Sequence, residues 1–392
     1  MNKNLKLINK FIVISLLVYS FTDSKNIYAS KEPIIRVLIS KEKNLRIRAD
    51  GKIPLIIKHK DFSKKNVKGL TIKQGRDKIS LTLDQNKSKV FQIKGNEGLI
   101  IKSFDRKGIW VGSKRYSGLL NIVALNKKIF VVNILGIEKY LSSVVGAEMP
   151  HKWPLEALKA QAIASRTYAL KKIGNDLYDI DSTQRDQVYS GLESKTFKTK
   201  KAVRQTRSLV IIHDNKLINA LFHSSSAGMT ENSEDVWQNK YPYLTSVKDF
   251  DQNNPKLKWK KSFSAKQLEI LFPNIGGVKD AQILDLTKTG RIKNIKLIGN
   301  SGSIDIAGKN LRKKMGLKST LFRFKFLKNN SGEETQKNLN PSLLISGLGA
   351  GHGVGMSQWG ARYMAINGYK AHDILKYFYK GIQIKPFKDI YK

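Results

Sequence analysis

The chain has 392 residues, of which 41% are hydrophobic, so it is long enough for two or three domains and has the composition of a globular protein. It contains no cysteine, which excludes disulfide bonds, thiolate metal sites and cysteine nucleophiles. Its 71 basic and 31 acidic residues give a net charge of +40, which favours anionic partners, although a solvated lysine-rich surface without a partner is the alternative.

Residues 1–29 have the layout of a secretory signal peptide. Three lysines precede an apolar run at residues 11–21, and Tyr28-Ala29-Ser30 offers a small-residue cleavage site. The run is shorter than the ~20 apolar residues of a membrane span, but Ile27 suits the −3 position poorly, so a membrane tether through residues 11–21 is the alternative. We therefore expect export across the cytoplasmic membrane, to the periplasm or cell wall. Since no nucleic-acid-binding module is recognisable, we expect anionic cell-envelope surfaces and no nucleic acid as partners.

Residues 30–115 predict a β-rich N-terminal part. Short β-branched runs, several of which alternate apolar with polar residues, are separated by turn residues and show no catalytic character. These runs cover residues 33–40, 44–49, 54–59, 69–74, 78–84, 89–94 and 98–103. The pattern continues through residues 109–125 and 128–135, which predict a hairpin about Asn126-Lys127-Lys128 that completes the next domain.

The stretch 136–173 predicts two helices joined by a tight Met-Pro-x-x-Trp-Pro turn. Apolar residues recur at helical spacing up to residue 144, and Met149-Pro150 ends the first helix because the residue before a proline is disfavoured in the α conformation. Glu148 then lies at the C-terminal end, on the apolar side. Burial and the helix dipole both disfavour the carboxylate, so we expect a raised pKa for Glu148, as in a general acid for glycosidic cleavage. A solvated helix end is the alternative.

The second helix is expected to begin at Pro154 and to carry one apolar stripe of leucine, alanine and isoleucine side chains. Its larger polar-tipped side chains are Gln161, Arg166 and Tyr168. Further helices are expected at residues 195–208, 265–271, 308–315, from Gln358 to Gly368, and at 371–379.

Three blocks of this sequence resemble the stage II sporulation protein D family, which also includes the amidase-enhancer proteins. The blocks are residues 140–170, which contain Glu-Met-Pro, 222–247 and 347–379; they keep the family's order within a likeness that covers roughly residues 116 to 384. The resemblance implies a peptidoglycan lytic transglycosylase that cleaves the MurNAc–GlcNAc bond of glycan strands and leaves 1,6-anhydro-MurNAc ends. It also implies that Glu148, the glutamate of Glu-Met-Pro, is the catalytic acid and then the base that activates the sugar's own 6-hydroxyl.

Several side chains of these blocks are candidates for holding the sugars. Residues 224–226 form a hydroxyl cluster beside His223; a serine nucleophile is disfavoured there because the Gly-x-Ser-x-Gly elbow is missing. His352 lies among alternate glycines, which leave room for a neighbouring backbone or a ligand. The predicted sugar-binding residues are Gln161, Arg166, Tyr168, Ser224, Ser225, Ser226, His352 and Gln358.

No metal or cofactor is expected. Asp179, Asp181 and Asp186 lack the spacing and the glycine of an EF-hand loop and more readily cap turns. Some family relatives carry cysteines near the histidine of the second block that allow zinc binding, and this sequence has none.

We therefore predict an α+β protein in which a β-rich part, residues 30–115, is joined to a mixed helix and sheet catalytic unit with a substrate cleft, residues 116–392. Two other functions stay open. The first is a non-catalytic cell-wall-binding protein that recruits or enhances an amidase. The second is a peptidoglycan glycoside hydrolase, for which Glu231, Glu234 or Asp235 would supply the second carboxylate.

Overall fold

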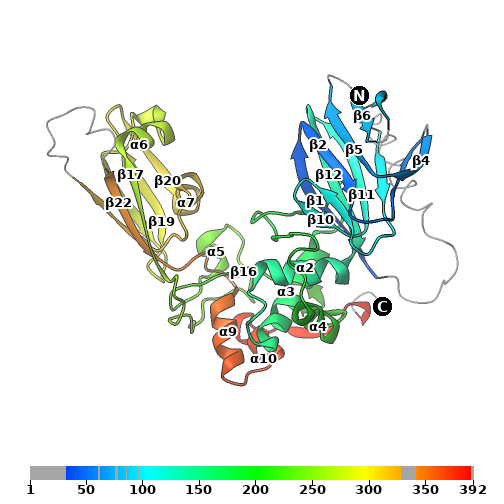
Figure 1. Ribbon diagram of the computed structural model, residues 1–392. Coiled ribbons are helices and arrows are strands. Elements are labelled where there is room, and N and C mark those ends of the chain that lie inside the picture. Colours follow the sequence, from blue (N-terminus) through cyan, green and yellow to red (C-terminus); the bar gives the residue numbers. More distant parts are fainter. Residues whose placement is uncertain are drawn as a thin grey trace, which may run out of the picture. The chain divides into compact units, whose positions relative to one another are not determined.

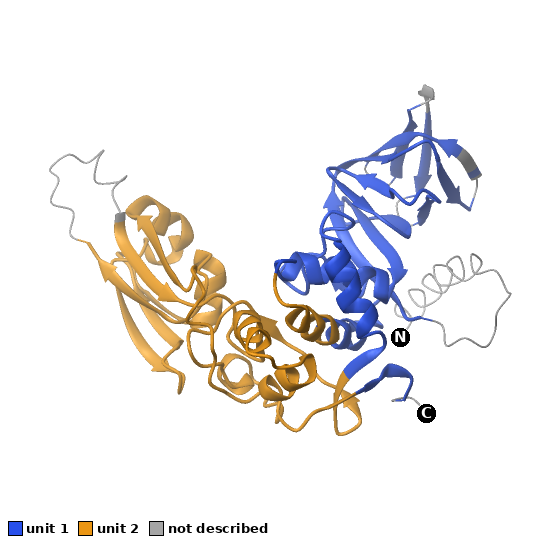
Figure 2. Cartoon of the chain, turned by 60° about the horizontal axis from the view of Figure 1, so that its bottom comes forward, with its two compact units in different colours: residues 1–152, 165–210, 385–392 blue, residues 153–164, 211–384 orange. Residues whose placement is uncertain are grey.

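The computed structural model describes residues 32–60, 62–75, 78–84, 86–94, 97–327 and 341–389 (Figure 1). Helices and strands in several sheets confirm the α+β class. The chain forms two compact units, which Figure 2 colours separately: unit 1 from residues 1–152, 165–210 and 385–392, and unit 2 from residues 153–164 and 211–384. The predicted signal segment and tether lie outside the described residues, and the domain boundary near residue 115 stays a prediction.

Unit 1 contains a seven-stranded sheet of order β13-β1-β12-β11-β8-β3-β4 and a six-stranded sheet of order β10-β9-β2-β5-β6-β7. Their strands are β1 (Ile34–Glu42), β2 (Asn44–Ala49), β3 (Leu55–His59), β4 (Phe62–Val67), β5 (Gly69–Gln74), β6 (Lys78–Leu83), β7 (Asn86–Lys94), β8 (Leu99–Lys102), β9 (Ile109–Val111), β10 (Lys114–Tyr116), β11 (Leu119–Leu125), β12 (Lys128–Gly136) and β13 (Ile180–Asp181). All seven strands predicted between residues 33 and 103 are confirmed. Strand β4 was not predicted, because it has a single apolar residue at each end; it pairs with β3.

The hairpin of β11 and β12 leads directly into the central helices. Its turn is made by Asn126 and Lys127, whose φ angles of 50° and 57° are those of a two-residue turn that matches the twist of the strands. Strand β12 lies between β1 and β11, and its residues from Ile129 to Leu135 are all buried. Helix α2 (Ile137–Glu148) follows at once, so the core strand fixes where this helix begins.

Helices α3 (Leu155–Lys172) and α4 (Phe197–Gln205) follow α2. The stripe predicted for α3 was too narrow, because the helix is buried all round from Ala157 to Leu170, except at Lys159 and Tyr168. Its many alanines let other elements approach from every side. Within the described part of the chain, no helix is both long and apolar enough to cross a membrane.

Unit 2 contains four small sheets of order β15-β14-β24, β16-β23, β17-β22-β21 and β18-β19-β20, and β14 and β24 begin or end in unit 1. Its elements are β14 (Leu209–His213), β15 (Lys216–Leu217), β16 (Phe222–His223), α5 (Ser233–Val236), β17 (Lys258–Ser264), α6 (Ala265–Leu271), η1 (Pro273–Ile275), β18 (Asp280–Leu286), β19 (Ile292–Ile298), β20 (Ser303–Ala307), α7 (Gly308–Met315), β21 (Phe322–Phe326), β22 (Pro341–Leu348), β23 (Met356–Ser357), α9 (Gln358–Ile366), α10 (Ala371–Phe378) and β24 (Gln383–Pro386). The short helix η2 (Phe387–Asp389) follows β24 and belongs to unit 1. Helices α6 and α7 have the predicted bounds, and Leu268 and Leu311 anchor them in one core with Trp259 and Ile345.

The second and third family blocks come together in unit 2. Strand β16 pairs in parallel with β23, so that Phe222 lies opposite Met356 and His223 opposite Ser357. Glycines make this approach possible: a Cβ at Gly355 would lie 2.2 Å from the Leu221 carbonyl oxygen, and one at Gly351 would lie 2.6 Å from the His223 Cβ. The alternate glycines therefore admit a neighbouring backbone, as the sequence analysis allowed.

Candidate active site

Glu148 is the last residue of α2, as predicted, and is half-buried. The helix ends because Met149, which precedes Pro150, is extended, with φ −127° and ψ 140°. The Val188 backbone N–H donates a hydrogen bond of 2.7 Å to Glu148 Oε1. The carboxyl group is therefore held in a defined orientation at the end of a buried helix.

The two neighbours of Val188 fix its N–H in place. The Tyr140 hydroxyl donates to Gln187 Oε1 at 2.9 Å, and the Tyr189 hydroxyl donates to Asn133 Oδ1 at 2.7 Å. The side chains of both tyrosines, of Gln187 and of Asn133 are buried. Burial, assisted by the nearby Tyr189 and Glu148, raises the pKa of Tyr140 well above its usual range, so this phenol stays a hydrogen-bond donor. Helix α2, strand β12 and this segment thus form one rigid support for Glu148.

Tyr168 lies in unit 1 with Glu148 and is half-buried. Its hydroxyl donates to Asp186 Oδ1 at 2.7 Å, and Lys172 lies 3.2 Å from the same carboxylate. Against the effect of burial, hydrogen bonds from the Asp181 N–H and from Tyr168 lower the pKa of Asp186. The Tyr168 ring is therefore held by a charged partner, and its contact with sugar stays a prediction.

Arg166 lies behind the surface, with 1% of its side chain exposed. Its guanidinium donates to both carboxylate oxygens of Glu138, at 2.9 and 2.7 Å, and to the Leu209 carbonyl at 3.1 Å. The side chain therefore ties the start of α2 to the start of β14. These bonds give Arg166 a structural role in this conformation, and sugar binding by it stays a prediction.

Gln161 and Gln358 are brought together in unit 2, where the amide of Gln358 lies 3.5 Å from Gln161 Oε1. Both side chains are buried, with 0% and 6% of their surfaces exposed. The contact joins α3 to the start of α9, and hence the first family block to the third.

The serine cluster divides into two kinds of residue. The Ser225 and Ser226 hydroxyls are buried and donate to the carboxylates of Asp251 and Asp249, respectively. Ser224 is half-buried. Burial, with the neighbouring Asp251, raises the pKa of Asp249 to about 6. Ser225 and Ser226 therefore support the loop from within, and contact of the three serines with sugar stays a prediction.

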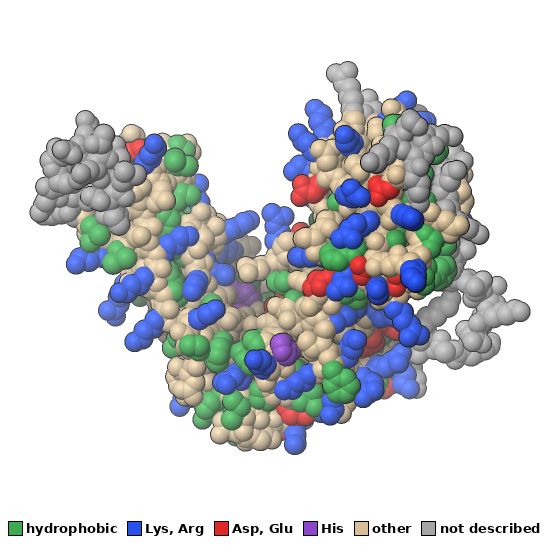
Figure 3. Space-filling model, in the orientation of Figure 1, with side chains coloured by type: hydrophobic (Ala, Val, Ile, Leu, Met, Phe, Trp, Pro, Cys, Tyr) green, Lys and Arg blue, Asp and Glu red, His purple; other side chains and the backbone are tan. Residues whose placement is uncertain are grey.

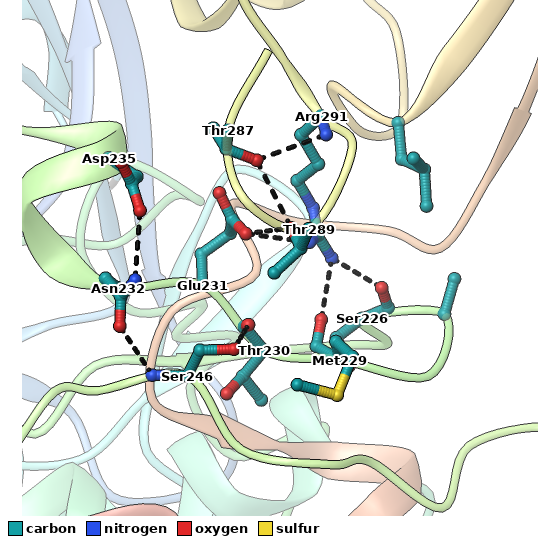
Figure 4. A network of polar contacts seen from close by, with 12 residues as sticks. Ser226, Met229, Thr230, Glu231, Asn232, Asp235, Ser246, Thr287, Thr289 and Arg291 are labelled. Carbon is teal, nitrogen blue, oxygen red and sulfur yellow. Dashed lines mark hydrogen bonds and ion pairs between the residues drawn. The ribbon is translucent and has the colours of Figure 1, made fainter.

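Glu231 belongs to a buried network that Figure 4 shows. Its side chain is fully buried, lies 3.3 Å from Arg291 Nη1 and accepts a hydrogen bond from the Thr289 hydroxyl. Arg291 also donates to the carbonyl oxygens of Ser226 and Met229. The other two acidic residues of this region are engaged as well: the Glu234 carboxylate accepts from the Ser233 hydroxyl at 3.2 Å, and Asp235 accepts from the Asn232 amide at 3.0 Å.

His352 is half-buried, and its ring centroid lies 5.6 Å from that of His223 and 5.2 Å from that of Trp237. Its Nδ1 accepts a hydrogen bond from the Val354 N–H at 3.1 Å. Burial, assisted by Arg312 and Arg291, lowers the pKa of His352 to about 3, so the ring is neutral at physiological pH. Whether it contacts sugar stays a prediction.

Metal binding requires several His, Asp or Glu side chains close together. Among the described residues, no group of three or more His, Asp or Glu side chains could hold a metal ion. Asp179 accepts from Arg36, and Asp181 accepts from the Thr183 N–H at 2.9 Å. Asp181 therefore caps a turn of its own loop, as the sequence favoured, whereas Asp179 ties this segment to β1 through Arg36.

Comparison with known proteins identifies the family. The family model described as SpoIID, Stage II sporulation protein, matches residues 125–213. The Stage II sporulation protein D of Bacillus subtilis is 33% identical over 274 residues, which cover 64% of this chain and 75% of that protein. The chain belongs to the stage II sporulation protein D family. An uncharacterized protein of Brachyspira hyodysenteriae is 33% identical over 304 residues, 76% of this chain and 78% of its own length. The Amidase enhancer of Bacillus subtilis is 31% identical over 299 residues, but these cover only 40% of it.

Within the family blocks, sequence reasoning missed an aromatic pair. Trp153 and Trp359 are both half-buried, and their rings meet edge to face with centroids 4.9 Å apart. The Arg362 guanidinium lies 5.9 and 5.1 Å from the two ring centroids. Partly exposed aromatic rings are common at binding surfaces. Their positions in the sequence could have indicated them as site residues, because Trp153 comes five residues after Glu148 and Trp359 directly follows Gln358.

Proposed function

We propose that this protein is an exported lytic transglycosylase that cleaves the MurNAc–GlcNAc bond of peptidoglycan glycan strands, with Glu148 as general acid and base. The observation that carries the proposal is the support of Glu148: it ends a buried helix, and the anchored Val188 N–H holds one of its carboxyl oxygens at 2.7 Å. Membership of the family adds support, because the first family block contains this glutamate.

In the proposed mechanism, Glu148 protonates the glycosidic oxygen as the bond breaks. With Oε1 accepting from the Val188 N–H, the transferred proton is carried by Oε2. The resulting carboxylate then removes the proton of the sugar's 6-hydroxyl, whose oxygen attacks the oxocarbenium-like carbon and closes the 1,6-anhydro ring. The 6-hydroxyl belongs to the reacting sugar, so this step gains from proximity and needs no second carboxylate.

The contacts of Glu231, Glu234 and Asp235 favour a transglycosylase over a glycoside hydrolase. A retaining glycosidase needs a carboxylate nucleophile, and an inverting one needs a carboxylate that activates water. Glu231 is fully buried and paired with Arg291, and Glu234 and Asp235 bond to their neighbours around the short helix α5. Burial and the pairing with Arg291 thus argue against Glu231 as a nucleophile.

The test is digestion of purified sacculi by the Glu148→Gln variant. The variant should fold like the wild type and release no muropeptides, because only the proton donor is altered. The matched control is Glu234→Gln, which should cleave normally. Release of muropeptides by Glu148→Gln at the wild-type rate would refute the catalytic assignment.

Digestion in heavy-oxygen water, read by mass spectrometry, identifies the type of reaction. Anhydro ends without solvent oxygen are expected. Reducing ends that carry the label would establish hydrolysis, and loss of cleavage in Glu234→Gln would then point to that residue as the second carboxylate.

A second candidate function follows from the relative named Amidase enhancer. A protein of that kind would bind the cell wall and stimulate an amidase without cleaving glycan. If wild type and Glu148→Gln bind sacculi equally, neither cleaves them, and both raise the activity of a cell-wall amidase, this function replaces the first.

A further inference from the structure

A cavity of about 310 Å³ lies at the start of α2, beside α4, entirely within unit 1. Glu138 in the first turn of α2 lines it, ten residues before Glu148, which corresponds to about 15 Å along the helix axis. The cavity is therefore separate from the candidate active site. Its lining is Glu32, Glu138, Lys139, Ser142, Lys195, Lys200, Val203, Arg204 and Arg207, five basic side chains against two acidic ones.

Both acidic side chains of this basic pocket already have partners. Glu138 binds Arg166, which lies behind the pocket wall, through two hydrogen bonds. Glu32 Oε1 accepts from the Glu138 backbone N–H at 2.8 Å, and its Oε2 lies 3.8 Å from Arg207. Both carboxylates of the lining are thus engaged by other groups of the protein.

Four basic side chains of the pocket have no such partner. Lys139, Lys195, Lys200 and Arg204 form no ion pair with any residue that the structure describes. Lys195 is half-buried among them, and burial, together with the charges of Lys200 and Lys139, lowers its pKa to about 8. Collecting like charges without a counterion costs folding free energy, and an anion in the pocket would relieve that cost.

We propose that the basic pocket binds phosphate groups of a phosphodiester polymer. A phosphate places its negative charge on several oxygens, so one group can bond to more than one of the four cations, whereas a single carboxylate leaves more of them unpaired. A water molecule occupies about 30 Å³ of liquid, so the cavity has room for a phosphate and the groups that flank it in a polymer. The inference concerns binding alone and does not depend on glycan cleavage.

A polymer fits the lining better than a lipid headgroup does. Val203 is the single apolar side chain of the lining. The nearby apolar feature is Phe197, which is 81% exposed at the start of α4, one turn before Lys200. A lipid surface would use this ring for insertion, and a poly(glycerol phosphate) chain would not. Phe197 therefore separates the two occupants in an experiment.

The probe is fluorescently labelled poly(glycerol phosphate), titrated with the full-length protein at fixed ionic strength. The double variant Lys139→Ala/Lys200→Ala should bind at least tenfold more weakly than the wild type, and inorganic phosphate should compete with the polymer. The matched control, Lys43→Ala/Lys73→Ala, removes two exposed lysines of unit 1 and the same net charge, and should change affinity less than twofold. All four lysines are exposed, so both variants are expected to fold; Arg204→Ala provides an independent change in the pocket.

Three results would overturn the proposal. An equal loss of affinity in the pocket and control variants would mean that overall charge, and not the pocket, binds the polymer. Lys and Arg side chains are scattered over the visible surface of the protein (Figure 3). Binding to phosphatidylglycerol vesicles that Phe197→Ser abolishes, with no binding to the polymer, would assign the pocket to lipid. Binding only to muropeptides that carry free stem-peptide carboxylates would assign it to those groups. Polymer binding that Phe197→Ser leaves unchanged is the expected outcome.

Discussion

Replacing Arg166 by methionine tests whether this residue supports unit 1 or binds substrate. In the structure the guanidinium is 1% exposed and makes two hydrogen bonds to Glu138 and one to the Leu209 carbonyl. Methionine fills much of the same volume but leaves the Glu138 carboxylate without its partner. Breaking one side of a buried ion pair costs about 3–5 kcal/mol. Since 16% of the Glu138 side chain is exposed and some solvation remains, we expect about 3 kcal/mol.

The second variant in this test is the double substitution Arg166→Met/Glu138→Gln. It removes the stranded charge and should recover about half of the lost stability, because a neutral amide is far less costly to leave unpaired than a carboxylate. The assay is chemical denaturation, followed by the transition of unit 1, since a chain with two compact units need not unfold in one step. Unchanged stability of Arg166→Met, combined with weaker binding to glycan strands, would refute this reasoning and support the sequence-based prediction that Arg166 holds sugar.

Three further predictions concern Val188, Gly146 and Lys195. The Val188→Pro variant lacks the N–H that bonds to Glu148, so its turnover should fall about 10- to 100-fold, as expected for the loss of a hydrogen bond to a charged group. The control is Val188→Ala, which keeps the N–H. Equal activity of the two variants would contradict the role assigned to this N–H. The Gly146→Ala variant should have a lower melting temperature, because its Cβ would lie 2.0 Å from the Ser194 carbonyl oxygen, although alanine is normally more stable than glycine inside a helix. A raised melting temperature would contradict this steric argument. Burial lowers the pKa of Lys195 to about 8 from 10.5, so the unfolded chain binds more protons than the folded one between these two pH values. The stability contributed by this residue should therefore rise from pH 8 to 10.5, as measured by denaturation midpoints. The same pH dependence in Lys195→Met would exclude this lysine as its source.

Local patterns in the sequence predicted much of the framework. The strands of the N-terminal part follow from short β-branched runs, several of them alternating, and the hairpin at Asn126-Lys127 follows from two such runs separated by a short polar segment. The end of α2 follows from Met149-Pro150, because proline restricts the residue before it. Each of these features is decided by residues a few positions apart, so no tertiary information was needed. The position of Glu148 at a helix end was predicted for the same reason.

Partners between distant segments were decided only by the tertiary structure. The sequence marked Arg166 as a polar side chain on a helix, but only the tertiary structure brings it to Glu138, 28 residues away. In the same way, Ser225 and Ser226 meet Asp251 and Asp249 across a turn of the chain.

The basic pocket has the same origin, because its lining comes from Glu32, the start of α2, Lys195 and the region of α4. Sequence spacing carries no signal for such contacts. They arise when strands and helices that form locally bury their apolar faces together, and the polar side chains caught between them then find their partners.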